Sequence, residues 1–147
     1  MNYGALEGYT CIDVSGHVAG PYASSLIGDL GCEVIKIELP TGGDTHRGRN
    51  PKYEGYGPSF RALNRNKKSV TLNLQDEKAR DILVKLLTKA DIFLENFRPP
   101  TRTRLGLDYE WLAQRNPKLI HCSISGYGQS GPYPNKPGFD TIGQALS

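Results

Sequence analysis

Short apolar runs alternate along the chain with segments whose apolar residues recur every three or four positions. Four runs, at residues 9–14, 33–38, 91–95 and 118–125, have the length and composition of buried strands. A fifth, at residues 69–74, alternates apolar and polar side chains like a half-exposed strand. The pattern therefore predicts five strands.

Helical periodicity lies between these runs. The first predicted helix begins near Pro21, since a first turn tolerates proline, and ends near Gly31, since glycine is common just after a helix. The second follows Asp76 as N-cap and has one apolar stripe from position 79 to 87. Asp108 caps a shorter one, and residues 139–147 begin a further helix-like stretch.

Strands that alternate with helices predict an α/β fold with right-handed crossovers and a mostly parallel sheet. Ligands of such sheets bind at the carboxyl ends of the strands. The segments to examine for function are therefore those that follow strands, namely 15–21, 39–49, 96–104 and 126–138. The long segment after residue 38 contains prolines and a Gly-Gly pair, and loops of this length in compact domains are usually functional or mobile.

Composition narrows the class of protein. A chain of 147 residues, with 22% charged and 37% hydrophobic residues, is typical of one folded domain and argues against disorder. Three cysteines, odd in number and far apart, suggest buried small side chains in a reducing compartment. We expect no membrane contact and a cytoplasmic location, with the mitochondrial matrix as the alternative in a eukaryote, because neither a membrane-spanning run nor a targeting pattern is present.

The positive charge is concentrated in one part of the chain. Residues 39–75 contain seven basic and two acidic residues, a local excess of +5 against +3 for the whole chain. Within this part, residues 64–69 (NRNKKS) place three cations beside a predicted strand. They suit a phosphate clamp or a solvated turn, and they lack the interleaved aromatics of a nucleic-acid site.

Two further motifs carry candidate chemistry. Residues 126–131 match G-x-G-x-x-G, but the prolines that follow prevent a helix from starting there, so we interpret the segment as a glycine-rich flap and not a dinucleotide fingerprint. Asn96 and Phe97 directly follow a buried strand and could orient and stack on a planar base, although Phe97 also suits the core. Arg102 and Arg104 suit phosphate.

The histidines at 17, 46 and 121 lack metal-ligand spacing, and His121, in mid-strand, is interpreted as a packed side chain. No Ser-His-Asp set, P-loop or HExxH motif is present. Asp44 and Asp140 follow glycines and are explained by turns or caps.

Together these segments resemble the class III CoA-transferases, the CaiB/BaiF family, to which alpha-methylacyl-CoA racemases also belong. The resemblance keeps family order over nearly the whole chain. The matching segments are CIDVS (11–15), AGPYA (19–23), GDLG (28–31), EVIKIE (33–38), GGD (42–44), NRNKKS (64–69), ENFRP (95–99), LGL (105–107) and SISGYGQSGP (123–132).

The resemblance implies that residues 1–147 are the N-terminal, CoA-binding portion of a Rossmann-like large domain. It implies an interlocked homodimer. The expected substrates are acyl-CoA and a small carboxylic acid, and we expect no prosthetic group, no metal and no nucleic-acid partner. It also assigns CoA contacts: His17, Val18 and Ala19 along the CoA, Leu72, Asn96 and Phe97 at its adenine end, Arg104 at a phosphate, and Lys136 as a further basic contact.

The family's nucleophile is an aspartate that would follow Ser147, so no catalytic residue is assigned here and the chain is expected to be inactive alone. That aspartate attacks the acyl-CoA thioester to give a mixed anhydride, and the returning CoA thiolate gives an aspartyl-CoA thioester. Racemases carry a His-Asp pair where this chain has Phe139-Asp140, and phenylalanine cannot exchange a proton, which favours a transferase.

Three residues depart from the family pattern. Pro100 replaces a common glycine, and Leu39 and Gln75 stand where some relatives have basic residues, so the phosphate contacts are expected to be rearranged. The alternatives to a transferase fragment are a non-catalytic CoA-binding or subunit-interaction module, a fragment of a racemase-like enzyme, and a nucleic-acid-binding domain that uses residues 47–68.

Overall fold

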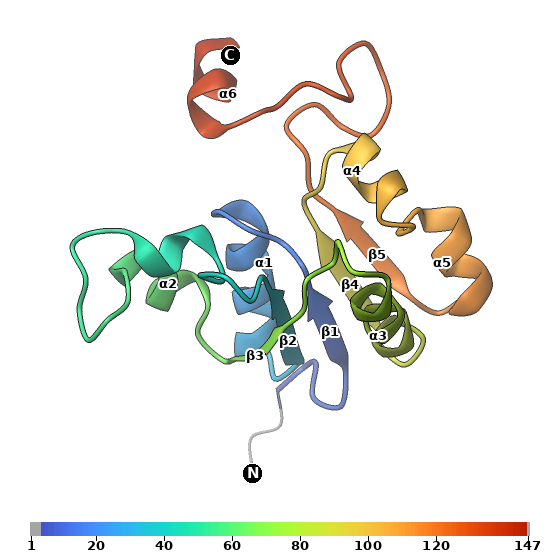
Figure 1. The fold of residues 1–147 in the computed structure, drawn as a ribbon, viewed down its shortest axis with the longest axis horizontal. Helices are drawn as coiled ribbons and strands as arrows, with labels where there is room; N and C mark the ends of the chain where they lie inside the picture. The colour runs from blue at the N-terminus through green and yellow to red at the C-terminus, as the bar shows by residue number, and fades with distance from the viewer. Residues whose placement is uncertain (1–3, 147) are drawn as a thin grey trace.

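The computed structural model describes residues 4–146 as a parallel sheet with helices on both faces (Figure 1). The five strands of this sheet lie in the order β3-β2-β1-β4-β5, and every neighbouring pair is parallel. The α/β fold with a parallel sheet predicted from the sequence is thereby confirmed. The strands are β1 (Thr10–Asp13), β2 (Glu33–Glu38), β3 (Lys67–Thr71), β4 (Ile92–Glu95) and β5 (Ile120–Ser123).

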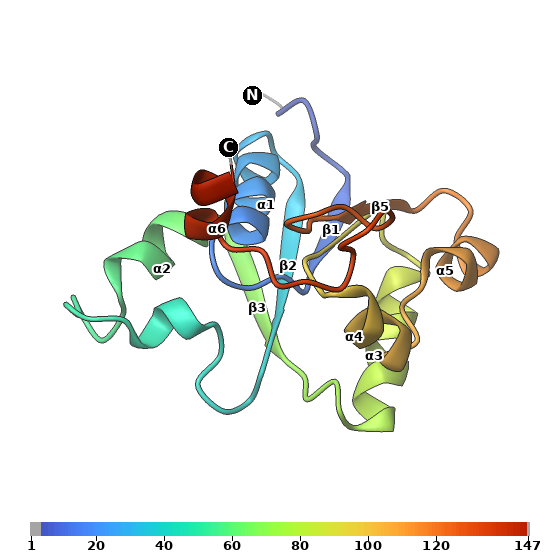
Figure 2. The same cartoon turned by 90° about the horizontal axis from the view of Figure 1, so that it is seen from above.

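Helices cover the two faces of the sheet separately. α1 and α2 lie on one side, and α3, α4 and α5 lie on the other (Figure 2). Because side chains of a strand alternate between faces, neighbouring residues of β1 serve different cores. Cys11 packs toward α1, and Ile12 packs with Leu83 and Leu87 of α3. The helices are α1 (Ala19–Asp29), the 3₁₀ turn η1 (Thr45–Gly48), α2 (Pro58–Leu63), α3 (Glu77–Leu87), α4 (Pro99–Arg104), α5 (Tyr109–Arg115) and α6 (Asp140–Leu146).

The edge strand β3 differs from its prediction. It spans 67–71 instead of 69–74, and most of it is exposed. The apolar residues Leu72 and Leu74, which suggested a strand, follow β3 and pack against the main core from the loop. The alternation of apolar and polar residues therefore reflects the burial of Leu72 and Leu74 by tertiary packing, although the strand itself ends at Thr71.

Three short elements were not predicted, namely η1, α2 and α4. Each has six residues or fewer, which is too short to show an apolar stripe. Two of them begin with proline, at Pro58 and Pro99, because the first turn of a helix does not need the missing N–H.

The three cysteines are free thiols, as predicted, with Cys11 and Cys32 buried and Cys122 half-buried. None of the helices between residues 4 and 146 is long and apolar enough to cross a bilayer.

Candidate functional site

The carboxyl end of β1 is organised around a buried carboxylate. Asp13, the last residue of β1, accepts hydrogen bonds from the backbone N–H of Ser15 at 2.8 Å and from the hydroxyls of Ser15 and Ser24, each at 2.5 Å. Ser15 begins the loop after β1 and Ser24 lies in α1. Asp13 thus fixes the loop and the helix to the end of the strand.

Two buried lysines compensate this carboxylate. Lys36 Nζ lies 4.0 Å from Asp13 and 3.1 Å from Asp44, and it donates to the Ser15 carbonyl at 2.8 Å. Lys67 Nζ donates to Asp13 at 3.2 Å and to the Pro21 carbonyl at 2.7 Å. Burial acts to raise the pKa of Asp13, but the two ammonium groups outweigh it and the pKa lies below its ordinary value. Burial lowers the pKa of Lys67 to about 8, against a smaller opposing effect of Asp13.

The loop after β2 is held by a second carboxylate. Glu38 accepts two hydrogen bonds from Arg47, at 2.7 and 2.6 Å, and one each from the Asp44 N–H and the Ser69 hydroxyl. Although burial opposes the charged form, these donors lower the pKa of Glu38 to about 2. The segment that begins at Leu39 is therefore folded back onto the end of β2.

The loops after β1 and β4 meet through one side chain. Asn96 accepts from the Gly16 N–H at 3.0 Å and donates to the Gly16 carbonyl at 2.8 Å. The strand order reverses between β1 and β4, which is where open parallel sheets bind ligands. Three of the predicted site residues, His17, Val18 and Ala19, follow Gly16 directly and are exposed at this place.

His17 has a left-handed backbone, with φ of 64°, which is uncommon for a residue other than glycine. Its ring lies edge-on to Phe139, with ring centroids 5.4 Å apart. The segment that leads into α6 therefore approaches the loop after β1, and an aromatic ring occupies the position beside His17.

Two of the residues predicted for the adenine end, Leu72 and Phe97, contribute to the main core. Leu72, Phe97 and Leu105 are partly buried and pack against the same core cluster. Next to Leu105, Arg104 ends α4 and lines a cavity of about 450 Å³ with Gln75 and Arg80. This volume lies in the range of small-molecule pockets, about 300–1,000 Å³. Arg80 was not among the residues singled out in the sequence.

Lys136 lies in the flap, defined as residues 126–138. Its ammonium is 4.0 Å from the ring centroid of Tyr133, and nothing in the described part of the chain joins it to the other predicted site residues. The flap is closed at its base, because a Cβ on Gly126 would lie 2.6 Å from the Cα of Gly138. No helix begins within residues 124–139, as the prolines predicted.

The flap is anchored to α4 by a polar network that sequence reasoning missed. Arg102 donates to Gln129 at 2.6 Å and lies 3.6 Å from the buried Glu95. Glu95 also accepts from Phe97 N–H at 2.6 Å and lies 3.3 Å from His121, and these contacts lower its pKa despite burial. His121 is 4% exposed at its side chain, so its interpretation as a packed residue is confirmed. No pattern in the sequence connects residues so far apart along the chain.

The basic excess of residues 39–75 is largely neutralised by acids. Arg65 pairs with Asp29, Lys68 with Glu33, and Lys67 with Asp13. The three cations of the NRNKKS segment are therefore engaged, and Lys67 is buried. Lys67 therefore belongs to neither a solvated turn nor a phosphate clamp open to solvent, while Arg65 and Lys68 form exposed ion pairs with acids.

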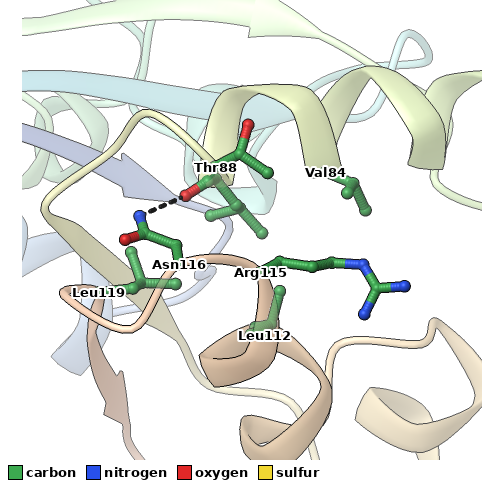
Figure 3. A pocket seen from close by; sticks show the side chains of 7 residues that line it. Val84, Thr88, Leu112, Arg115, Asn116 and Leu119 are labelled. Carbon is green, nitrogen blue, oxygen red and sulfur yellow. Dashed lines mark hydrogen bonds between the residues drawn. The ribbon is translucent and has the colours of Figure 1, made fainter.

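A crevice between α3 and α5 is a packing feature. Val84, Leu112 and Leu119 line it and leave no space for a water molecule. Figure 3 shows Asn116 at its edge, donating to the Leu87 carbonyl at 2.9 Å. The crevice marks the place where α3 and α5 pack against each other, and it has no room for a ligand.

The fold agrees with what comparison with known proteins shows. The family model of CoA-transferase family III matches residues 6–147. The chain belongs to this family.

Curated relatives include enzymes of known activity. The chain is 44% identical over 144 residues to an acetyl-CoA:oxalate CoA-transferase of Acetobacter aceti, covering 98% of this chain and 37% of the relative. It is 40% identical over 147 residues to the succinyl-CoA:glutarate CoA-transferase of Homo sapiens, covering 99% and 34%. The chain thus spans little more than a third of the relatives' length.

Among solved structures, a CAIB/BAIF family protein from Brucella suis superposes with a TM-score of 0.92 at 37% identity. The match covers 99% of this chain and 39% of that protein.

Proposed function

We propose that this chain is the CoA-binding part of an enzyme that transfers CoA between carboxylic acids. Two observations at the carboxyl end of the sheet carry the proposal: Asn96 bridges to Gly16, and Arg104 lines a cavity together with Leu105. The curated relatives with CoA-transferase activity supply the ligand class.

CoA has a nucleotide end and a long pantetheine arm. In our proposal the nucleotide end lies at Leu72 and Phe97, whose partly buried side chains suit an adenine ring, and Arg104 takes a phosphate. The pantetheine arm then follows the exposed residues His17 to Ala19. Lys136 is a further basic contact in this proposal and would reach CoA from the flap.

The chemistry requires a nucleophile that we do not assign to any residue of this chain. A carboxylate attacks the acyl-CoA carbonyl to form a mixed anhydride and releases the CoA thiolate. The thiolate attacks the enzyme's carbonyl, which frees the first acid and leaves an enzyme–CoA thioester. An acceptor carboxylate attacks this thioester, forming a second mixed anhydride and releasing the CoA thiolate. The thiolate then attacks the acceptor's carbonyl, which gives the new acyl-CoA and frees the enzyme carboxylate. We propose that the chain alone binds CoA without turnover.

The contact between His17 and Phe139 favours transfer over racemisation. Racemisation at the carbon next to the thioester needs a base and an acid, and the ring beside His17 has no exchangeable proton. Exposed apolar residues on one side of α1, Tyr22, Leu26 and Leu30, agree with a protein that buries this helix in a dimer. From the family resemblance we propose an interlocked homodimer, and we also propose a cytoplasmic location, as expected from a sequence with no membrane-spanning run.

Calorimetric titration of the 147-residue chain with CoA tests the proposal. We expect saturable binding, and Arg104→Gln should weaken it by about 1.5–3 kcal/mol, as for a lost charge-assisted hydrogen bond. Arg115→Gln is the matched control, since Arg115 stacks on Trp111 in α5 and does not line the cavity beside Arg104. Failure of the chain to bind CoA, or equal affinity in the Arg104 and Arg115 variants, would overturn the proposal. Turnover by the chain alone would contradict our placement of the nucleophile.

A further inference from the structure

The cavity beside Arg104 contains a second arginine from a different element. Arg80 lies in α3, and Arg104 ends α4. The other lining residues are Gln75 and Leu105, so no carboxylate lines the cavity. Two guanidinium groups therefore border one cavity of about 450 Å³ without an acid among the lining residues.

The contacts of Arg80 leave most of its donors available. Its Nη1 donates to the carbonyls of Leu74 and Gln75, at 3.1 and 3.0 Å. These backbone oxygens hold the guanidinium beside the loop after β3 without neutralising its charge. A guanidinium has five N–H donors, so the remaining ones can serve a ligand.

Some other arginines of the described chain are engaged by acids. Arg47 pairs with Glu38, Arg61 with Glu54 and Arg65 with Asp29. Neither Arg80 nor Arg104 has a carboxylate within ion-pair distance among residues 4–146. Like charges that face one cavity repel each other, and an anion placed between them removes that repulsion.

We propose that Arg80 is a phosphate-binding residue that acts together with Arg104. The inference rests on the proposed CoA-binding function and adds a specificity-determining residue to it. Two arginines on separate elements form a fork that matches the several oxygens of a phosphate group, which a single arginine satisfies only in part. The neutral Gln75 at the same rim leaves Arg80 as the second cation of this site.

CoA offers two sources of phosphate, the 3′-phosphate of its ribose and the 5′-diphosphate. The shared chemistry is a phosphate group held by two guanidinium groups. Titration with CoA and with dephospho-CoA, which lacks only the 3′-phosphate, distinguishes the sources. If the site takes the 3′-phosphate, Arg80→Gln weakens CoA and leaves dephospho-CoA unchanged. If it takes the diphosphate, the variant weakens both ligands by the same factor.

The test uses Arg80→Gln with Lys85→Gln as its control, because Lys85 is an exposed cation on the same helix and does not line the cavity. We expect Arg80→Gln to weaken CoA binding about tenfold or more relative to this control. Arg80→Lys keeps the charge and loses the fork, so it should fall between the two. Circular dichroism checks that each variant is folded.

Equal CoA affinity in a folded Arg80→Gln variant and in Lys85→Gln overturns the assignment of Arg80. If Arg80→Gln does not fold, Arg80→Lys takes its place. Equal CoA affinity in Arg80→Lys and Lys85→Gln then overturns the assignment. This outcome is separate from failure of the proposed function. If Arg104→Gln weakens CoA and Arg80→Gln does not, only the second arginine is excluded. If the wild-type chain binds no CoA, the proposed function fails as well.

Discussion

The side-chain amide of Asn96 makes two hydrogen bonds to the backbone of one residue, Gly16, although 80 positions separate them in the sequence. The amide accepts from the N–H at 3.0 Å and donates to the carbonyl at 2.8 Å. It thereby joins the loops after β1 and β4 at the place where the strand order reverses. Only a side chain with both a donor and an acceptor can make this pair of bonds.

Replacing Asn96 by aspartate should separate the two loops. The carboxylate keeps the bond to the Gly16 N–H, but it faces the Gly16 carbonyl without a donor, so repulsion replaces one hydrogen bond. We expect a loss of about 1–3 kcal/mol in the free energy of unfolding and weaker CoA binding. Urea denaturation and calorimetry measure the two effects. Gln114→Glu, at an exposed position of α5, is the control, and matching results for the two variants would contradict the role of Asn96.

The flap should depend on the contact between Gly126 and Gly138. A methyl group on Gly126 would lie 2.6 Å from the Cα of Gly138, and backbone cannot move aside as a flexible side chain can. We expect Gly126→Ala to open the base of the flap and to increase proteolysis within residues 127–137. Gly143→Ala, at a helical position with open space around it, is the control and should not change the cleavage pattern. Equal protection in both variants would show that the flap does not need this contact.

Glu38 should make the free energy of unfolding depend on pH in the acid range. Its pKa is lowered from 4.5 to about 2, so its contribution is fully present above pH 4.5 and is lost as the pH falls toward 2. Glu38→Gln removes this contribution, so the variant should lose less stability than the wild type between pH 5 and pH 2. At neutral pH it should be less stable by about 3 kcal/mol, since Arg47 loses its partner. Parallel pH profiles of the two proteins would contradict this account.

Asp13 should be the most sensitive of the buried charges. Asp13→Asn leaves Lys36 and Lys67 in the interior without the carboxylate between them, and breaking a buried ion pair costs about 3–5 kcal/mol. Asp29→Asn breaks only the exposed pair with Arg65 and should change stability little. Denaturant unfolding of both variants at pH 7 gives the comparison, and a similar small effect for both would refute the structural role of Asp13.

Lys67 should make a contribution to stability that increases as the pH rises above about 8. The pKa of Lys67 falls from 10.5 to about 8 on folding, so the unfolded chain binds more protons between these values. Stability from this group therefore increases as the pH rises from about 8 toward 10.5. Lys67→Met should lower the slope of unfolding free energy against pH relative to the wild type between pH 8 and 9, and equal slopes in the two proteins would argue against the burial of this ammonium.

The main strands could be predicted because their chemistry is local. Residues 33–38 carry β-branched side chains at buried positions, and the helix after Asp76 has an apolar stripe that its own sequence displays. The role of Lys36 could not be predicted in this way. It interrupts an apolar strand, and its partners Asp13 and Asp44 lie on other elements, so only the folded sheet shows why a charge is tolerated there.

The same limit applies to the candidate site. Asn96, Phe97 and Arg104 were suggested by their positions after a strand and by family resemblance. Arg80 gave no signal, because an arginine on a surface helix is ordinary in sequence. Only the packing of α3 beside the end of α4 places it at the same cavity as Arg104.

Mapping the CoA site by NMR tests the central claim most directly. Amide chemical shifts of the ¹⁵N-labelled chain would be followed during titration with CoA. If CoA binds at the carboxyl end of the sheet, the largest changes in chemical shift will occur at residues 16–19, at 72–80 and from Asn96 to Leu105. Changes concentrated in α5 (Tyr109–Arg115) or in α2 (Pro58–Leu63), or no changes at saturating CoA, would contradict the account.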